Sequence, residues 1–534
     1  MKSIPMKFVK IIIGIVLLVI YAAMIFVFMD ANMEHYTAFM HSDIASEALL
    51  STVIYEQGAF LPETWVVASA IHLITAPNLA ALIYPLTGFN LQISMGIACC
   101  IMMIILQAVV FAYMRQIGFS NIEALAILLI VLSLTKAQDH TQVMILLYAM
   151  DYVSHIITCF IMLMLYNHNM KKGKLGIFAV LLATGIAVIN GFQGMHASLF
   201  LYWPLVGVEI VRQIISLIKK HKLTRWDISI WVGAEAALTL LVNFLSAVYD
   251  PAPTRNIRHA FDKFMAEVVP ALHDTVISGR LIVITVAILV MAAVGYVIAI
   301  GRLVKDDGLS GVKTGEAVAS ESDAKAEDSK GVKPIFLWST LCFPASAVIV
   351  FILTTFTTSL VASRYFIMLV YAVATGAMML VRYFPSWVKA ICGVILAVYA
   401  VVAVSSFYQK LIVEDTSENS DFYKVYAWMR DNGYDYGYST FDHANSITVM
   451  GNNTVKVRCV NNMYDMEGSR WLTDVSWYPP MKDPSGKTCY IVSDANMEDF
   501  KGFLKRFNPT IVREEDLGYF DVYVLDHDYT VWER

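Results

Sequence analysis

The sequence predicts a mainly α-helical polytopic membrane domain followed by a small α/β domain at the C-terminus. Of the 534 residues, 57% are hydrophobic and 16% are charged, a composition that excludes a soluble cytoplasmic enzyme. The formal net charge is −5, and no basic block is rich enough to hold a nucleic-acid backbone. We therefore expect the chain in the cell membrane, with the lipid bilayer and no nucleic acid among its partners.

Eleven apolar runs are predicted to cross the membrane, because a helical span needs about 20 mainly apolar residues. The first run follows Lys2, Lys7 and Lys10 and is too long to be a cleaved signal peptide. The runs are Ile11–Phe28, Leu91–Met114, Ile122–Leu134, Leu147–Tyr166, Leu175–Ile189, Ser198–Ile218, Ile228–Val248, Leu281–Ile300, Ile335–Thr355, Tyr365–Val381 and Ala390–Phe407.

The distribution of Lys and Arg predicts which side of the membrane each loop occupies. Val66–Leu86 is also long and uncharged, but it contains Pro77 and Pro85, and residues 30–90 hold no Lys or Arg. If this stretch does not span, the basic residues gather in one alternating set of loops, as cytoplasmic loops require. We therefore expect broken helices at the outer face, a cytoplasmic N-terminus and an extracytoplasmic C-terminus.

Three further segments complete the predicted organisation. The membrane domain covers residues 1–412 and includes an outer loop at 29–90 with amphipathic helices. Residues 303–333 are rich in Ser, Gly, Ala, Lys and acidic residues and are predicted to form a disordered cytoplasmic linker. Residues 413–534 are predicted to form an extracytoplasmic α/β domain, with helices at Asp421–Asp431 and Met497–Phe507 and strands at 454–460, 487–493 and 519–526.

Two cysteines of the C-terminal domain leave two interpretations open. Cys459 and Cys489 could form a disulfide outside the cell or remain as two buried thiols.

The first outer loop contains the most informative pair of acidic residues. Asp43 and Glu47 are four apart and would lie on one face of a helix, presenting two carboxylates at the membrane surface. They are the candidate catalytic residues. Asp43 is equally well placed to be the N-cap or a first-turn residue of that helix.

The predicted outer ends of other spans provide further candidates for substrate binding. Ionisable groups at membrane depth usually face a cavity, although arginines also snorkel to the interface and lone histidines are often packed in the core. The candidates are Arg364 and Tyr365, Arg280 with the nearby cluster of Arg255, Arg258, His259 and Lys263, the pair Asp151 and His155, Asp139 and His140, and the histidines His72 and His196.

The order of these features resembles the GT-C class of glycosyltransferases. A first span is followed by a long outer loop with the early Asp43, a helix, Pro62 and Trp65. The similarity is to the branch with protein O-mannosyltransferase-like and lipid A aminoarabinose-transferase-like enzymes, and it covers the plan of the membrane domain. It implies a polyprenyl-phosphate sugar donor, an acceptor-facing role for Asp43, and a lipid-phosphate site at the outer ends of later spans. The family often has two adjacent acids in this loop, whereas Ile44 follows Asp43 here.

The chemistry of such a transfer needs few groups. The phosphate leaves without the general acid of a glycoside hydrolase, so one base and one cation suffice. Asp43 would take the proton of an acceptor hydroxyl, which predicts inversion, and Arg364 would neutralise the departing phosphate. No cofactor is required, although a divalent metal ion could assist.

The predicted function is an integral membrane glycosyltransferase that moves one sugar from a polyprenyl-phosphate carrier to an envelope glycan, lipid or protein at the outer face. The alternatives are a polysaccharide exporter or lipid-linked-sugar flippase, and a membrane sensor with an outer ligand-binding domain. The sequence lacks the GxxxxGK[ST], HExxH, CxxC and GxSxG motifs, so ATP-driven transport and metalloprotease chemistry have no support.

Overall fold

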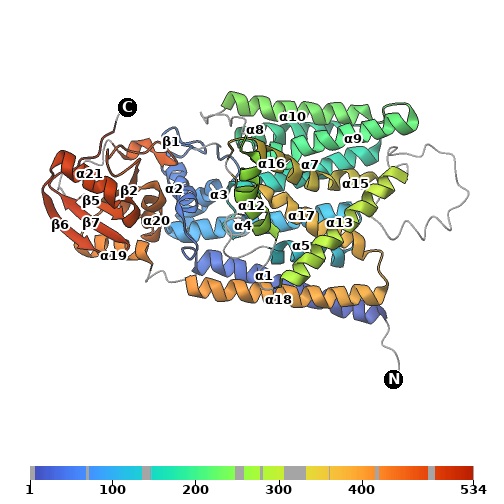
Figure 1. The fold of residues 1–534 in the computed structure, drawn as a ribbon, viewed down its shortest axis with the longest axis horizontal. Helices are drawn as coiled ribbons and strands as arrows, with labels where there is room; N and C mark the ends of the chain where they lie inside the picture. Colours follow the sequence, from blue (N-terminus) through green and yellow to red (C-terminus); the bar gives the residue numbers. More distant parts are fainter. Residues whose placement is uncertain are drawn as a thin grey trace, which may run out of the picture. The chain divides into compact units, whose positions relative to one another are not determined.

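The computed structural model divides into two compact units (Figure 1). The helical unit comprises Met1–Phe28, Met102–Leu146 and Asp151–Tyr408, and the mixed unit comprises Met29–Ile101, Leu147–Met150 and Gln409–Arg534. The structure describes residues 6–67, 71–134, 145, 147–246, 258–276, 281–305, 332, 334–359, 361–414, 420–478 and 488–532. The predicted boundary at residues 412 and 413 stays a prediction. The predicted linker lies almost wholly outside the described residues.

Eight helices of the described chain are long and apolar enough to cross a membrane. Two shorter apolar helices, α5 and α8, and the more polar α7 coincide with the three remaining predicted runs. The prediction of a polytopic membrane protein is therefore confirmed. The helices with parts in the helical unit are α1 (Met6–Glu34), α4 (Leu91–Gln116), α5 (Asn121–Leu134), α7 (Asp151–Lys172), α8 (Ile177–Phe192), η3 (Ser198–Tyr202), α9 (Trp203–Lys220), α10 (Trp226–Ser246), α11 (Ala260–Lys263), η4 (Phe264–Val268), α12 (Val269–Val276), α13 (Ile282–Lys305), α15 (Pro334–Thr340), α16 (Cys342–Phe356), η5 (Ser363–Phe366), α17 (Ile367–Val381) and α18 (Ser386–Glu414).

Small residues allow close helix packing in the helical unit. A β-carbon at Gly295 of α13 would overlap the carbonyl oxygen of Gly376 of α17, so the two backbones touch where these glycines meet. Helices α1 and α18 lie side by side (Figure 1), with Gly393 against Ile13. Since lipid gives helices no hydrophobic reason to associate, such contacts carry much of the packing energy.

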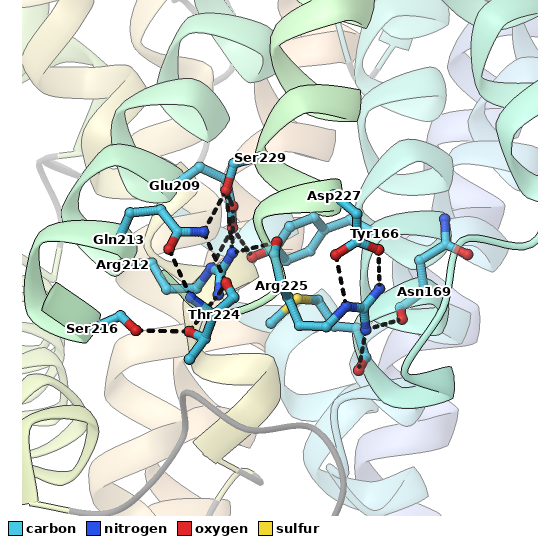
Figure 2. A network of polar contacts seen from close by, with 11 residues as sticks. Tyr166, Asn169, Glu209, Arg212, Gln213, Ser216, Thr224, Arg225, Asp227 and Ser229 are labelled. Atoms are coloured by element: carbon cyan, nitrogen blue, oxygen red, sulfur yellow. Dashed lines mark hydrogen bonds and ion pairs between the residues drawn. The ribbon is translucent and has the colours of Figure 1, made fainter. Parts of the chain in front are cut away.

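A buried ion pair stabilises the turn between α9 and α10 (Figure 2). Arg212 is fully buried and donates to both carboxylate oxygens of Glu209, at 2.8 and 2.7 Å. The same guanidinium donates to the carbonyl oxygen of Thr224 at 2.9 Å, and Glu209 accepts from the Tyr166 hydroxyl at 2.6 Å. Every charge in this network has a partner, which is the condition under which ions tolerate burial.

The mixed unit combines the first loop with the C-terminal residues. Its elements, beside the ends of α1, α4 and α18, are α2 (Ser42–Gln57), β1 (Trp65–Val66), α3 (Ala76–Ile83), η1 (Tyr84–Thr87), α19 (Asp421–Asn432), β2 (Tyr436–Thr440), α20 (Phe441–Met450), β3 (Lys456–Val460), β4 (Thr473–Asp474), η6 (Val475–Trp477), β5 (Cys489–Ser493), η8 (Asp494–Asn496), α21 (Met497–Phe507), β6 (Ile511–Asp516) and β7 (Phe520–Leu525). The stretch at Val66–Leu86 thus contains short pieces rather than a continuous span, as predicted.

A five-stranded sheet of order β3-β2-β5-β7-β6 forms the core of the C-terminal region. Strands β3, β2 and β5 are parallel, and β5, β7 and β6 are antiparallel. Alternate residues face opposite sides, so that Ile491 packs towards α19 and α20 while Tyr490 and Val492 pack towards α21. The predicted helices and strands of this region are confirmed.

The two cysteines of this sheet are thiols. Cys459 of β3 and Cys489 of β5 are both buried and unbonded to one another, and β2 lies between their strands. The Cys459 thiol donates to Asn445 Oδ1 at 3.4 Å, and the Cys489 thiol donates to the carbonyl oxygen of Tyr436 at 3.5 Å. The disulfide alternative is therefore wrong in this structure.

Removing one partner of the buried Arg212–Glu209 ion pair should destabilise the helical unit. We expect Arg212→Met to cost about 3 kcal/mol or more, because Glu209 would keep a buried charge without its cation. Thermal unfolding of the purified protein in detergent measures this loss as a lower midpoint. Lys501→Ala is the control, since its pair with Glu498 is exposed and should contribute under about 1 kcal/mol. Equal midpoints for Arg212→Met and the wild type would contradict the stabilising role of the pair.

Candidate functional site

Arg364 of the helical unit is held by two tyrosines. It lies in η5, just before α17, and its Nε donates to the Tyr152 hydroxyl at 2.9 Å. Its guanidinium carbon lies 5.7 Å from the ring centroids of both Tyr152 and Tyr365. Both contacts favour a localised positive charge, since aromatic faces attract cations. The hydrogen bond and the two rings together restrict where that charge can lie.

Two histidines extend this group of residues, which we call the Arg364 cluster: Tyr152, His155, His196, Arg364 and Tyr365. The His196 ring centroid lies 4.6 Å from that of Tyr152 and 5.5 Å from that of His155. His155 is fully buried, and its Nε2 lies 3.1 Å from the carbonyl oxygen of Gln193. Burial and the charge of Arg364 lower the pKa of His196 to about 4, so this imidazole is neutral at pH 7. The cluster therefore combines one arginine with two tyrosines and two histidines, of which His196 is neutral.

The cluster gathers the ends of three separate segments. Tyr152 and His155 lie in the first turns of α7, His196 follows the end of α8, and Arg364 precedes α17. In the predicted topology, all three are outer ends of spans. Of the predicted binding residues, Arg364, Tyr365 and His155 are thus brought together.

Other predicted cations and acids of the helical unit take different places. Lys263 is buried, and its Nζ donates to the carbonyl oxygens of Thr357 and Ser359, at 2.8 and 2.5 Å. It therefore stabilises the backbone before η5, and a role of the cluster at residues 255–263 in substrate binding stays a prediction. Asp151 is the first residue of α7, with its side chain outside the description. Arg255, Arg280, Asp139 and His140 lie outside the described residues.

Asp43 and Glu47 lie on α2 in the mixed unit, as predicted, but the helix is not at a surface. His41 is the N-cap residue and Asp43 lies in the first turn, so Asp43 is not the N-cap. Every residue from Ile44 to Ile54 is buried, including Glu47 with 6% exposure. The expectation that both acids face the membrane surface is wrong for Glu47, because neighbouring elements of the same unit cover this helix.

Specific contacts fix α2 against the C-terminal residues. Asn445 of α20 is fully buried and its Nδ2 donates to the Ser46 hydroxyl at 2.9 Å. Trp65 of β1 pairs with Asp474 of β4, and residues 64 and 475 are joined by a backbone hydrogen bond of 2.9 Å. These contacts determine where α2 carries Asp43, which is half-buried at the start of the helix.

His72 has a structural environment in the same unit. It is buried, and its carbonyl oxygen accepts from Asn78 Nδ2 at 3.1 Å. Asn78 and Thr75 form a capping box at the start of α3. Within the described part of the chain, no group of three or more His, Cys, Asp or Glu side chains is arranged to hold a metal ion.

Tyr152, whose hydroxyl accepts a hydrogen bond from Arg364, was not predicted from the sequence. Tyrosines are common at the ends of membrane spans, so Tyr152 had no distinguishing signal. Only its hydrogen bond to a residue 212 positions away separates it from an ordinary interfacial tyrosine.

The fold matches that of solved membrane proteins over nearly the whole chain. ArnT from Cupriavidus metallidurans bound to undecaprenyl phosphate aligns with a TM-score of 0.51 and 12% identity, covering 96% of this chain and 97% of ArnT. The apo structure of the same protein aligns with a TM-score of 0.54 and 10% identity over the same shares. ArnT is a member of the GT-C class, so the predicted resemblance to that class is confirmed at the level of the fold. No protein-family model and no curated protein matches the sequence.

The contact between Asn445 and Ser46 should control the stability of α2. We expect Asn445→Ala to raise the amide hydrogen-exchange rates of residues 44–54, since a lost buried hydrogen bond costs about 1–2 kcal/mol. Exchange of the full chain, followed by mass spectrometry, measures this change. Asn496→Ala is the control, because Asn496 bonds to Thr440 and Ser493 instead. Unchanged exchange of α2 in Asn445→Ala would show that other contacts hold this helix.

Proposed function

We propose that this protein is a membrane glycosyltransferase that transfers a sugar from a polyprenyl-phosphate carrier to an envelope acceptor. The full-length similarity in fold to ArnT, crystallised with undecaprenyl phosphate, is the observation that carries this proposal. The likeness spans both the helical and the mixed unit, since it covers 96% of the chain.

The phosphate end of the donor is assigned to Arg364. A guanidinium offers hydrogen-bond donors and a permanent charge, which suit a phosphate whose negative charge grows as the sugar leaves. Tyr152 and Tyr365 support this role, because they hold Arg364 through the contacts described above. His196, which is neutral at pH 7, adds no second cation. Arg364 is thus the binding cation, and Tyr152 is a positioning residue.

The acceptor end is assigned to Asp43. A half-buried carboxylate in the first turn of a helix can accept the proton of an acceptor hydroxyl as it attacks the anomeric carbon. The carrier phosphate leaves from the opposite face of the sugar, so the configuration inverts. Glu47 is buried one turn later, and its burial makes it the weaker candidate for proton transfer. His72 and Asp151 stay predicted binding residues with no assigned step.

The proposal also includes the side of the membrane on which the reaction takes place. We place the N-terminus in the cytoplasm and the C-terminal residues outside, with the reaction at the outer face, on the distribution of Lys and Arg along the sequence. The donor sugar and the acceptor then meet in the extracytoplasmic leaflet. The requirement for a divalent metal ion is tested by adding EDTA to the sugar-transfer assays below.

Asp43→Asn should abolish sugar transfer. Loss of a general base typically lowers the rate by 10²–10⁴-fold, and the amide cannot take the proton. In a deletion strain, wild-type protein should restore the missing envelope sugar, whereas Asp43→Asn at equal membrane abundance should not. The control is Glu63→Gln, an exposed acid of the same loop that should restore the sugar fully. Full restoration by Asp43→Asn would favour the exporter, flippase or sensor alternatives.

Tyr152→Phe should weaken transfer without abolishing it. The change removes one hydrogen bond to a charged group, worth about 1.5 kcal/mol, so we expect a loss of about tenfold in kcat/KM. Arg364→Met should lose about 100-fold or more. A purified-enzyme assay with a synthetic polyprenyl-phosphate sugar measures both values.

A second arginine–tyrosine hydrogen bond provides a matched control for the Tyr152→Phe variant. Arg302 Nη1 donates to the Tyr383 hydroxyl at 3.3 Å, so Tyr383→Phe removes the same kind of bond elsewhere in the helical unit. It should leave kcat/KM unchanged. Equal activity of Tyr152→Phe, Tyr383→Phe and the wild type would remove Tyr152 from the mechanism.

A further inference from the structure

A buried arginine in the mixed unit has two nitrogens without hydrogen-bond partners among the described residues. Arg458 lies on β3 with 3% of its surface exposed. Its Nε and Nη1 are buried and donate no hydrogen bond within the part of the chain that the structure describes. Burial lowers the pKa of the guanidinium to about 10, so the group stays charged at pH 7. Arginine is rarely buried without a paired anion, because desolvating a lone charge is costly.

The immediate neighbour of this charge is an aromatic ring. The guanidinium carbon of Arg458 lies 3.7 Å from the ring centroid of Trp477. The carboxylates of Glu56 and Asp474 favour the charged form of Arg458, but neither forms an ion pair with it in the described structure. Asp474 instead accepts from the backbone N–H of Ser476 at 2.8 Å. Trp477 therefore supplies only a cation–π contact.

A second unsatisfied donor belongs to Trp65, which packs against the ring of Trp477. Trp65 is buried with 7% exposure, and its ring packs edge to face against Trp477 with centroids 6.0 Å apart. Its indole Nε1 is buried and has no hydrogen-bond partner among the described residues. Nε and Nη1 of Arg458 and Nε1 of Trp65 are thus buried donors on two residues that contact one ring, and none of the three has an acceptor among the described residues.

Another arginine in this unit shows that a guanidinium can stack on tryptophan and still find hydrogen-bond acceptors. Arg513 lies over Trp428 with its guanidinium carbon 4.9 Å from the ring centroid. Its nitrogens donate to Asn432 Oδ1 at 2.7 Å and to Glu515 Oε2 at 3.2 Å. The lack of acceptors at Arg458 therefore reflects its own surroundings and is not a consequence of stacking on tryptophan.

We propose that Arg458, Trp65 and Trp477 form a binding site for an oxyanion. Nε and Nη1 of the guanidinium can each donate to an anion oxygen, and the indole N–H is a third donor from another residue. A tetrahedral phosphate group supplies acceptors in several directions, so it matches donors on two residues better than a planar carboxylate does. Binding here goes beyond the proposed sugar transfer and does not depend on it. The phosphate could come from a soluble anion or from a lipid headgroup.

The test measures thermal stability of the full chain in phosphatidylcholine nanodiscs. One arm compares potassium phosphate with potassium chloride at equal ionic strength, and the other adds phosphatidic acid to the nanodisc. We expect one of the two probes to raise the Tm of the wild type by several degrees, since a ligand that binds only the native state stabilises it. The responding probe identifies the source of the phosphate. No response to either probe would overturn the site.

Arg458→Met is the variant that separates binding from a general salt effect. It should lose the shift, and without the anion its Tm should equal or exceed that of the wild type, because an unpaired buried cation is removed. Arg513→Met, the matched control, should keep the shift. An equal shift in Arg458→Met and the wild type would overturn the proposal.

A second variant guards against misfolding of Arg458→Met. Trp65→Phe keeps an aromatic ring against Trp477 but lacks the indole N–H, so it should reduce the anion-dependent shift. An unchanged shift in Trp65→Phe, together with an unfolded Arg458→Met, would count against the site. All of these readouts are independent of sugar transfer, so an inactive Asp43→Asn enzyme can be tested in the same way.

Discussion

The organisation of the helical unit depends on one constraint: a polar or charged group away from water must find its partner within the protein. Arg212 satisfies it with Glu209, and Arg382 satisfies it with Glu123 through an ion pair of 2.9 Å. Both arginines also bind backbone carbonyl oxygens. The Arg382–Glu123 pair joins the end of α17 to α5, and Arg212 joins α9 to the turn before α10 through the carbonyl oxygen of Thr224.

Arg364 meets the same constraint with different partners. Tyrosine hydroxyl and ring faces stabilise its charge without neutralising it, whereas a carboxylate would cancel the charge. A cation held in this way keeps its attraction for an incoming anion. In Arg212, by comparison, a bidentate carboxylate occupies the fork of the guanidinium.

The mixed unit applies the constraint to residues from distant parts of the sequence. Asn445 satisfies Ser46, and Asn452 accepts from the backbone N–H of Leu91 at 2.7 Å. The first loop and the C-terminal residues therefore fold as one unit, in which residues 44–54 of α2 are buried. Arg458 and the indoles of Trp65 and Trp428 are among the exceptions in this unit, since they have desolvated donors without acceptors among the described residues. Exceptions of this kind can point to a ligand, because burying a donor without an acceptor costs free energy that contacts within the protein do not return.

Composition and periodicity were sufficient to predict the apolar helices, three strands and two helices of the C-terminal region, and the broken helices at Val66–Leu86. These features depend on the local alternation of apolar and polar residues, which a sequence displays directly. The sequence also placed Arg364 and Asp43 at the ends of segments where charges are unusual. It could not show that Tyr152 holds Arg364, that Lys263 binds backbone carbonyls, or that Glu47 is buried. Those facts depend on which segments pack together over separations of tens to hundreds of residues, and only the tertiary structure decides that.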